Sequence, residues 1–124
     1  MEPAQSSLLV VDDNEMNRDM LARRLARRGY TVAVAADGQQ ALQMLEAQSF
    51  DLILLDIMMP GISGYDVLVL LKRDPRFRDI PVIMISALSE LDSVVRCIEA
   101  GCNDYDSKPI EFPRLLGKIE ALLQ

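Results

Sequence analysis

Residues 52–64 read LILLDIMMPGISG, and this stretch decides the fold. Four apolar residues run directly into one carboxylate, Asp56, and a loop that contains Pro60, Gly61 and Gly64 follows. A short apolar run bounded by turn residues is typical of a strand buried on both faces of a parallel sheet. Ligands of open parallel sheets bind just beyond the carboxyl ends of the strands, so Asp56 is placed for chemistry. The simpler alternative is an aspartate that ends a strand and opens a turn.

The rest of the chain repeats the pattern of an apolar run followed by an amphipathic segment. Hydrophobic periodicity and turn residues predict strands at 8–11, 31–35, 52–55, 82–85 and 103–106. The same criteria predict helices at 15–28, 39–48, 64–73, 89–100 and from 111 or 112 to the end. Parallel strands are joined by helices in right-handed crossovers. The sequence therefore predicts one α/β domain over residues 1–124, a three-layer, doubly wound, flavodoxin-like (βα)5 fold with five parallel strands and a flexible leader at 1–6.

The third predicted helix is rich in apolar residues. Helical spacing predicts that Val67, Leu70 and Leu71 face the sheet. Val69 is then predicted to face water, with Leu68 on the flank of the helix. Apolar residues exposed in this way are either ordinary surface, which we favour, or a small patch that binds a partner.

Composition argues against several classes of function. Half of the 124 residues are hydrophobic, which is enough for a core, and the net charge of −6 argues against direct binding to nucleic acid. The arginine-rich segment 23–28 fits the C-terminal end of a helix instead. No apolar run is long enough to cross a membrane, and two cysteines without a secretory signal favour a reducing cytoplasm. The lack of histidine excludes histidine-dependent nucleophiles and the usual zinc sites.

Polar residues end four of the predicted strands at the same edge of the sheet. They are Asp12 and Asp13 after the first strand, Asp56 after the third, Ser86 after the fourth and Lys108 after the fifth. Each alone has an ordinary interpretation as a helix cap, a turn residue or a solvated charge. Together, three carboxylates would repel one another unless a cation lay among them, and Mg²⁺ prefers such oxygen ligands. A carboxylate beside Mg²⁺ and an ammonium group can act as the nucleophile in phosphoryl transfer.

The motifs around these residues are VVDDN at 10–14, LDIMMPG at 55–61, ISA at 85–87 and GCNDYDSKP at 101–109. They resemble the motifs of response regulator receiver domains, the CheY-like domains of two-component systems. The resemblance extends over residues 8–123. It implies that Asp56 accepts a phosphoryl group, and that Asp12, Asp13, Asp56 and the backbone carbonyl of Met58 bind Mg²⁺.

The resemblance also implies a conformational switch. Ser86 and Lys108 would bind the phosphoryl group, and Tyr105 would move inward when Ser86 engages it. The Lys108–Pro109 peptide bond would be cis, which an X-Pro bond adopts at little cost.

The implied function is a phosphorylation-dependent signalling switch that catalyses its own phosphorylation and dephosphorylation but has no separate substrate, so it is not an enzyme in the usual sense. The expected donor is a sensor histidine kinase or a histidine phosphotransfer protein. The expected receiver of the signal is an output domain or an effector protein, with homodimer formation on phosphorylation as one form of output. No direct contact with nucleic acid or membrane is expected, and the chain is either a stand-alone receiver or part of a longer regulator.

Three other classes of protein fit the sequence less well. A haloacid-dehalogenase-type phosphatase needs Asp-x-Asp after its first strand, whereas this strand ends in Asp12-Asp13-Asn14, and the chain has no room for a cap domain. A scaffold insensitive to phosphate would lack the aspartate or the lysine. A flavin-binding protein of this fold would carry a Ser/Thr/Gly-rich loop after the first strand.

Overall fold

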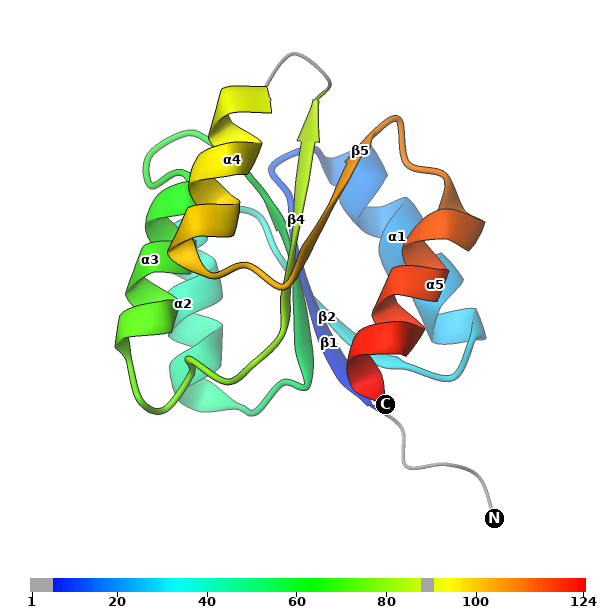
Figure 1. Cartoon of the computed structure of the whole chain (residues 1–124). Coiled ribbons are helices and arrows are strands. Elements are labelled where there is room, and N and C mark those ends of the chain that lie inside the picture. The colour runs from blue at the N-terminus through cyan, green and yellow to red at the C-terminus, as the bar shows by residue number, and fades with distance from the viewer. Residues whose placement is uncertain (1–5, 88–90) are drawn as a thin grey trace.

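The computed structural model describes residues 6–87 and 91–124, in which five strands and five helices alternate (Figure 1). The strands are β1 (Ser7–Val11), β2 (Thr31–Ala35), β3 (Leu52–Asp56), β4 (Val82–Ala87) and β5 (Asp104–Lys108). The helices are α1 (Glu15–Arg27), α2 (Gly38–Ala47), α3 (Gly64–Arg73), α4 (Leu91–Ala100) and α5 (Phe112–Leu123). Residues 1–5 of the expected leader and 89–90 of the fourth predicted helix lie outside the described residues.

The five strands form one parallel sheet in the order β2-β1-β3-β4-β5. Helices α1 and α5 cover one face of this sheet, and α2, α3 and α4 cover the other (Figure 1). The predicted three-layer, doubly wound fold is therefore confirmed. The chain moves outward from β1 to β2 and then returns to place β3 on the other side of β1. This reversal makes the carboxyl ends of β1 and β3 the topological switch point, where folds of this type bind ligands.

The two hydrophobic layers explain why β1 and β3 are almost entirely apolar. Side chains alternate between the faces of a strand. Leu9 and Leu55 pack in the core beneath α2, α3 and α4, while Leu8 and Leu54 pack in the core beneath α1 and α5. Every residue of β3 is buried, as a central strand covered by helices on both faces requires.

The last two strands extend further than the sequence predicts. β4 continues through Ser86 to Ala87, and β5 continues to Lys108, because Ser86 pairs with Ser107 and Ala87 with Lys108. β5 is an edge strand with few apolar residues, so hydrophobic periodicity does not reveal its end.

The predicted orientation of α3 is wrong at two positions. Leu68 is completely buried, whereas Leu70 is 47% exposed. The buried face consists of Gly64, Val67, Leu68 and Leu71, which follow the i, i+3, i+4, i+7 spacing of one helical face. The orientation is set by Gly64, which packs directly on the backbone at the end of β3. The alternative of an apolar patch on this helix therefore loses Leu68, which belongs to the core.

The corrected orientation predicts different costs for two neighbouring substitutions. Leu68→Ala should lower the free energy of unfolding by about 2–5 kcal/mol, because it opens a cavity in a closed core. The matched variant Leu70→Ala should change it by about 0.5 kcal/mol or less, because that side chain faces water. Urea unfolding monitored by circular dichroism measures both. Equal costs for the two variants would contradict this orientation of α3.

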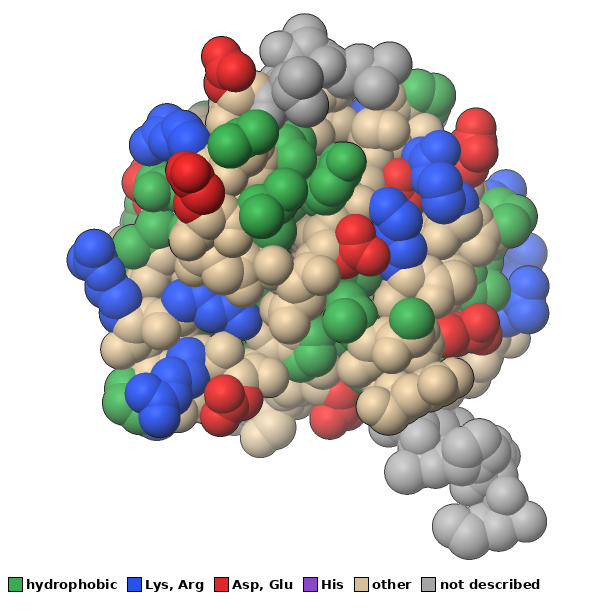
Figure 2. Space-filling model, viewed as in Figure 1, with side chains coloured by type: hydrophobic (Ala, Val, Ile, Leu, Met, Phe, Trp, Pro, Cys, Tyr) green, Lys and Arg blue, Asp and Glu red, His purple; other side chains and the backbone are tan. Residues whose placement is uncertain are grey.

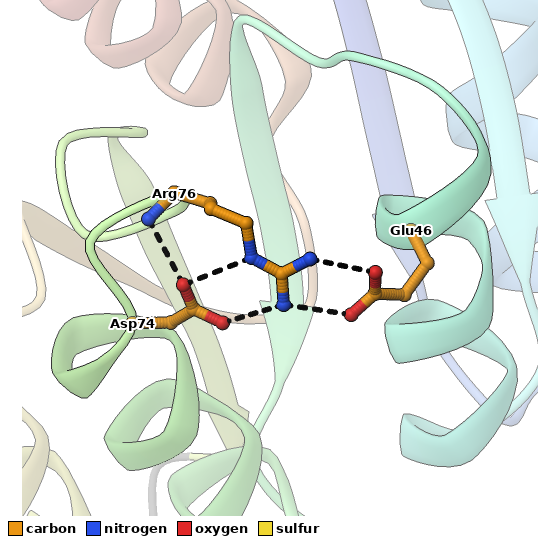
Figure 3. A network of polar contacts seen from close by, with 3 residues as sticks. All are labelled: Glu46, Asp74 and Arg76. Carbon is orange, nitrogen blue, oxygen red and sulfur yellow. Dashed lines mark hydrogen bonds and ion pairs between the residues drawn. The ribbon is translucent and has the colours of Figure 1, made fainter.

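A polar network at the amino ends of the strands connects α2 to the loop after α3 (Figure 3). The Arg76 guanidinium donates two hydrogen bonds to the Glu46 carboxylate, at 2.8 and 2.9 Å, and binds Asp74 on its other side. All three side chains are partly or largely exposed, so solvent screens these ion pairs. The network joins the C-terminal ends of α2 and α3, at the edge of the sheet opposite Asp56. Its role is structural, and it lies away from the candidate site.

Candidate functional site

Three carboxylates meet at the switch point of the sheet. Asp12 follows β1, with its N–H donating to the Ala35 carbonyl of β2 at 3.1 Å, and Asp56 is the last residue of β3. Both are buried, and Asp56 is only 2% exposed, whereas Asp13 faces solvent. One carboxylate oxygen from each of the three lies within 4.8 Å of the others. The convergence predicted from the strand ends is thus present.

The start of α1 fixes the Asp12 segment. Asn14 is the N-cap of α1, and its side chain accepts a hydrogen bond from the Asn17 N–H at 3.0 Å. The Asn14 N–H donates to Asp12 Oδ1 at 2.8 Å. Arg18 Nη1 donates to the Asp12 carbonyl at 2.9 Å. The sequence analysis did not identify Arg18, although its place one helical turn after Asn14 indicates that it can reach back to this loop.

Lys108 brings a positive charge into the acidic cluster from β5. Its Nζ donates to Asp56 Oδ2 at 2.9 Å and lies 3.8 Å from Asp12 Oδ2. The predicted convergence of Lys108 with the carboxylates is therefore present, and the side chain crosses between two strands that are not adjacent. The peptide bond between Lys108 and Pro109 is cis, as expected.

Burial and like charges change the protonation of this pair. The pKa of Asp56 is raised to about 6, mainly because the carboxyl is buried and also because Asp12 and Asp13 carry like charge, while the Lys108 hydrogen bond and charge act in the opposite direction. Burial lowers the pKa of Lys108, but its hydrogen bond to Asp56 and the surrounding carboxylates outweigh burial and raise it overall. The ammonium therefore stays charged, while Asp56 titrates close to neutrality.

A pocket of about 540 Å³ opens over Asp56 at this edge. Ser86, at the end of β4, is buried one residue before the wall residue Ala87. Tyr105, on β5, is 41% exposed, with Lys118 Nζ 5.3 Å from its ring centre. The lining includes Asn17, which sequence reasoning did not identify as a site residue. The residues that line the pocket are Asp13, Asn14, Asn17, Asp56, Met58, Ala87 and Lys108.

The donor set suits a hard divalent cation. Three carboxylates that share a site at this spacing repel one another, and a cation with oxygen ligands removes that repulsion. Asp12, Asp13 and Asp56 provide the carboxylate oxygens, and the pocket beside them has room for the water molecules that Mg²⁺ retains. Met58, expected to contribute its backbone carbonyl, lines the same pocket.

Fold and site together define a doubly wound α/β domain with an acidic centre and one lysine at the carboxyl edge of its sheet. Residues 8–120 match the family model described as "Response regulator receiver domain". The chain belongs to this family, whose members are phosphorylation-dependent switches of two-component signalling.

Individual relatives agree with this assignment. The chain is 41% identical to response regulator PleD of Caulobacter vibrioides over 115 residues, which cover 93% of this chain and 25% of PleD. It is 39% identical to the phosphate regulon transcriptional regulatory protein PhoB of Pseudomonas aeruginosa over 118 residues, which cover 95% of this chain and 52% of PhoB. The signal receiver domain of a signal transduction histidine kinase from Syntrophus aciditrophicus has a similar structure, with a TM-score of 0.89 and 33% identity, covering 95% of this chain and 89% of that one.

The curated relatives are considerably longer than this chain, which spans about a quarter of PleD and about half of PhoB. Within residues 6–87 and 91–124, no helix is long and apolar enough to cross a membrane.

Proposed function

We propose that Asp56 is the phosphoryl acceptor of this receiver domain and that the donor is a sensor histidine kinase or a histidine phosphotransfer protein. The observation that carries the proposal is the contact of Lys108 Nζ with Asp56 Oδ2 at 2.9 Å, inside a cluster of three carboxylates at the switch point. A carboxylate oxygen of Asp56 attacks phosphorus while the bond from phosphorus to the donor's imidazole nitrogen breaks. The domain thereby catalyses its own phosphorylation, and hydrolysis of the acyl phosphate returns it to the resting state.

The neighbouring residues have separate roles in this proposal. Asp12, Asp13 and Asp56, with the Met58 carbonyl, hold Mg²⁺, which supplies positive charge for the phosphoryl oxygens when bound. Lys108 exchanges its contact with Asp56 for one with a phosphoryl oxygen, and the Ser86 hydroxyl donates to another. The buried position of Asp56 excludes bulk water from the carboxylate and strengthens these electrostatic contacts.

The direct test is incubation with acetyl phosphate, a small donor that needs no kinase. Intact-protein mass spectrometry should show the addition of one phosphoryl group in the presence of Mg²⁺ and none in EDTA. Unmodified protein under both conditions would refute the proposal.

The titration of Asp56 predicts the pH dependence of Mg²⁺ binding. Protons and the cation compete for the same oxygens, so affinity should be highest above the raised pKa of about 6 and fall as the pH decreases through it. Asp13→Ala should weaken binding by about tenfold or more, because it removes a charged ligand. The matched variant Asp19→Ala, an exposed position on α1, should bind as wild type does. Isothermal titration measures each affinity, and equal values for the Asp13 variant and wild type would exclude this residue as a ligand.

The second element of the proposal is a two-state switch from Ser86 to the surface. Figure 2 shows hydrophobic side chains gathered over α4, and Val95, Ile98 and Tyr105 are among the exposed large apolar residues. A phosphoryl group that draws Ser86 toward Asp56 should favour the inward position of Tyr105 and so alter this face.

Beryllofluoride, which mimics a bound phosphoryl group, should shift the resonances of Tyr105 and of α4 in NMR spectra of the wild type. The Ser86→Ala variant should bind beryllofluoride but show smaller changes at Tyr105, because the hydroxyl that couples the two positions is removed. Identical changes in both proteins would show that Ser86 does not transmit the signal.

We propose that the α4–β5–α5 face contacts an output domain, an effector protein or a second copy of the phosphorylated chain. The length of PleD and PhoB supports an output domain in a longer protein. The free thiols of Cys97 and Cys102 support a reducing cytoplasm as the location.

A further inference from the structure

Side chains bind the backbone of β5 in two similar units. An edge strand leaves alternate N–H and C=O groups without a partner strand, and β5 is an edge strand of this sheet. In the first unit, the Tyr105 N–H donates to Asp104 Oδ1 at 2.7 Å, and its carbonyl accepts a hydrogen bond from Lys118 Nζ. In the second, the Ser107 N–H donates to Asp106 Oδ1 at 2.8 Å, and its carbonyl accepts from Arg114 Nη2 at 3.3 Å.

Each unit also contains an ion pair between β5 and α5, and the two pairs differ in the burial of the carboxylate, since the Arg114 and Lys118 side chains are both partly exposed. Asp104 and Lys118 are 3.7 Å apart and both are partly exposed. Asp106 is 2% exposed, and its Oδ1 lies 2.7 Å from Arg114 Nη2. Its other oxygen, Oδ2, is buried and accepts no hydrogen bond from any residue in the described ranges. Arg114 is therefore needed to compensate the buried carboxylate of Asp106. The carboxylate of Asp104 reaches solvent and does not need Lys118 in the same way.

The unit that contains Asp106 also contains Ser107, which lies next to both proposed phosphoryl ligands, Ser86 and Lys108. Ser107 precedes Lys108 in the chain and pairs with Ser86 across the strands. Arg114 binds both the Asp106 carboxylate and the Ser107 carbonyl, so α5 fixes the backbone directly before Lys108. On the basis of the proposed function, we propose that Asp106 and Arg114 form a positioning pair that holds the Lys108 ammonium against Asp56.

The pair makes no contact with the reacting atoms, and its action is geometric. The Lys108 side chain extends from β5 past β4 to reach Asp56 at the end of β3. A small displacement at the root of the side chain therefore moves Nζ out of hydrogen-bond range. The carboxylates of the metal site come from the carboxyl ends of β1 and β3 instead, so displacement of β5 should leave them in place.

The test uses a double variant that removes the pair without leaving a buried charge. Arg114→Leu alone leaves the buried Asp106 carboxylate unpaired and can unfold the domain, whereas apolar replacement of both partners leaves no buried charge. Asp106→Leu with Arg114→Leu should therefore fold. Its rate of phosphorylation by acetyl phosphate should fall by about tenfold, since misplaced catalytic groups cost rate, while its Mg²⁺ affinity remains that of wild type. The matched variant Lys118→Met, which disrupts the exposed unit, should keep the wild-type rate.

A second measurement does not depend on phosphorylation. The chain has only three lysines, Lys72, Lys108 and Lys118, so the Nζ resonance of Lys108 can be assigned in ¹⁵N spectra recorded in EDTA. In the double variant this resonance should move toward that of a solvated lysine, and in Lys118→Met it should stay in place.

Three results would overturn the positioning role. They are a folded double variant with the wild-type rate, a parallel loss of rate and Mg²⁺ affinity, and an unchanged Lys108 resonance. If wild type itself accepts no phosphoryl group, the proposed function fails, and the Lys108 resonance alone then decides whether the pair positions this side chain.

Discussion

Asp56→Asn should take up no phosphoryl group from acetyl phosphate and Mg²⁺, leaving only the background seen for wild type in EDTA. The amide is nearly the same size as the carboxylate but is a far poorer nucleophile, so the substitution removes the acceptor and changes little else. Intact-protein mass spectrometry measures the modification. The matched variant Asp19→Asn alters an exposed aspartate on α1 and should be modified at the wild-type rate. Equal modification of the Asp56 variant and wild type would place the acceptor at another residue.

The stability of Asp56→Asn should show that its failure to take up a phosphoryl group does not come from unfolding. The folded pKa of Asp56 lies above its ordinary value of 3.8, at about 6, so the protonated carboxyl is the form that the fold favours. Its contribution to stability is full below the ordinary pKa and is lost as the pH rises through about 6. In EDTA, Asp56→Asn should therefore match wild type at acidic pH and exceed it by about 1–3 kcal/mol above pH ~7. A destabilised variant at alkaline pH would contradict the raised pKa.

The sequence was sufficient to predict the fold and the acidic centre because both follow from the ends of buried strands. In β1 and β3 an uninterrupted apolar run stops at a carboxylate, and parallel pairing then brings those carboxylates together. This argument needs only the order of the elements and not their exact packing. The same holds for the place of Lys108 at this edge, where the structure pairs it with Asp56.

Features that depend on how elements pack against one another could not be predicted in this way. Whether Leu68 or Leu70 enters the core depends on the rotation of α3, which follows from the contact of Gly64 with the end of β3. The burial of Asp106 depends on Arg114 of α5, and an alternating strand pattern assigns no partner to an acidic residue. Both features concern side chains whose environment is supplied by a different element.

The contact at Gly64 links the packing of α3 to the position of Asp56. The Gly64 N–H donates to the Ile57 carbonyl at 2.7 Å, which joins the start of α3 to the segment after β3. A Cβ atom on Gly64 would lie 2.0 Å from the Asp56 carbonyl oxygen and 2.8 Å from Ile57 Cα. These are backbone atoms of a central strand end, so no side chain can rotate away to make room. Glycine is needed here for close approach rather than for an unusual φ angle.

Gly64→Ala should therefore be among the most damaging single-methyl additions in the chain. It should lower the free energy of unfolding by about 3 kcal/mol or more, because α3 must move away from β3 or Asp56 must shift. The matched variant Gly117→Ala, in α5, should gain about 0.5–1 kcal/mol from helix propensity, because no described residue outside its own helix turn lies within 4 Å of the added Cβ. Urea unfolding compares the two. In the folded fraction of Gly64→Ala, the displaced Asp56 should also lose its contact with Lys108, seen as a change in the Lys108 Nζ resonance. If Gly64→Ala were as stable as wild type, the backbone at the end of β3 would be able to move without energetic cost. If the Lys108 resonance were also unchanged, α3 would not set the position of Asp56.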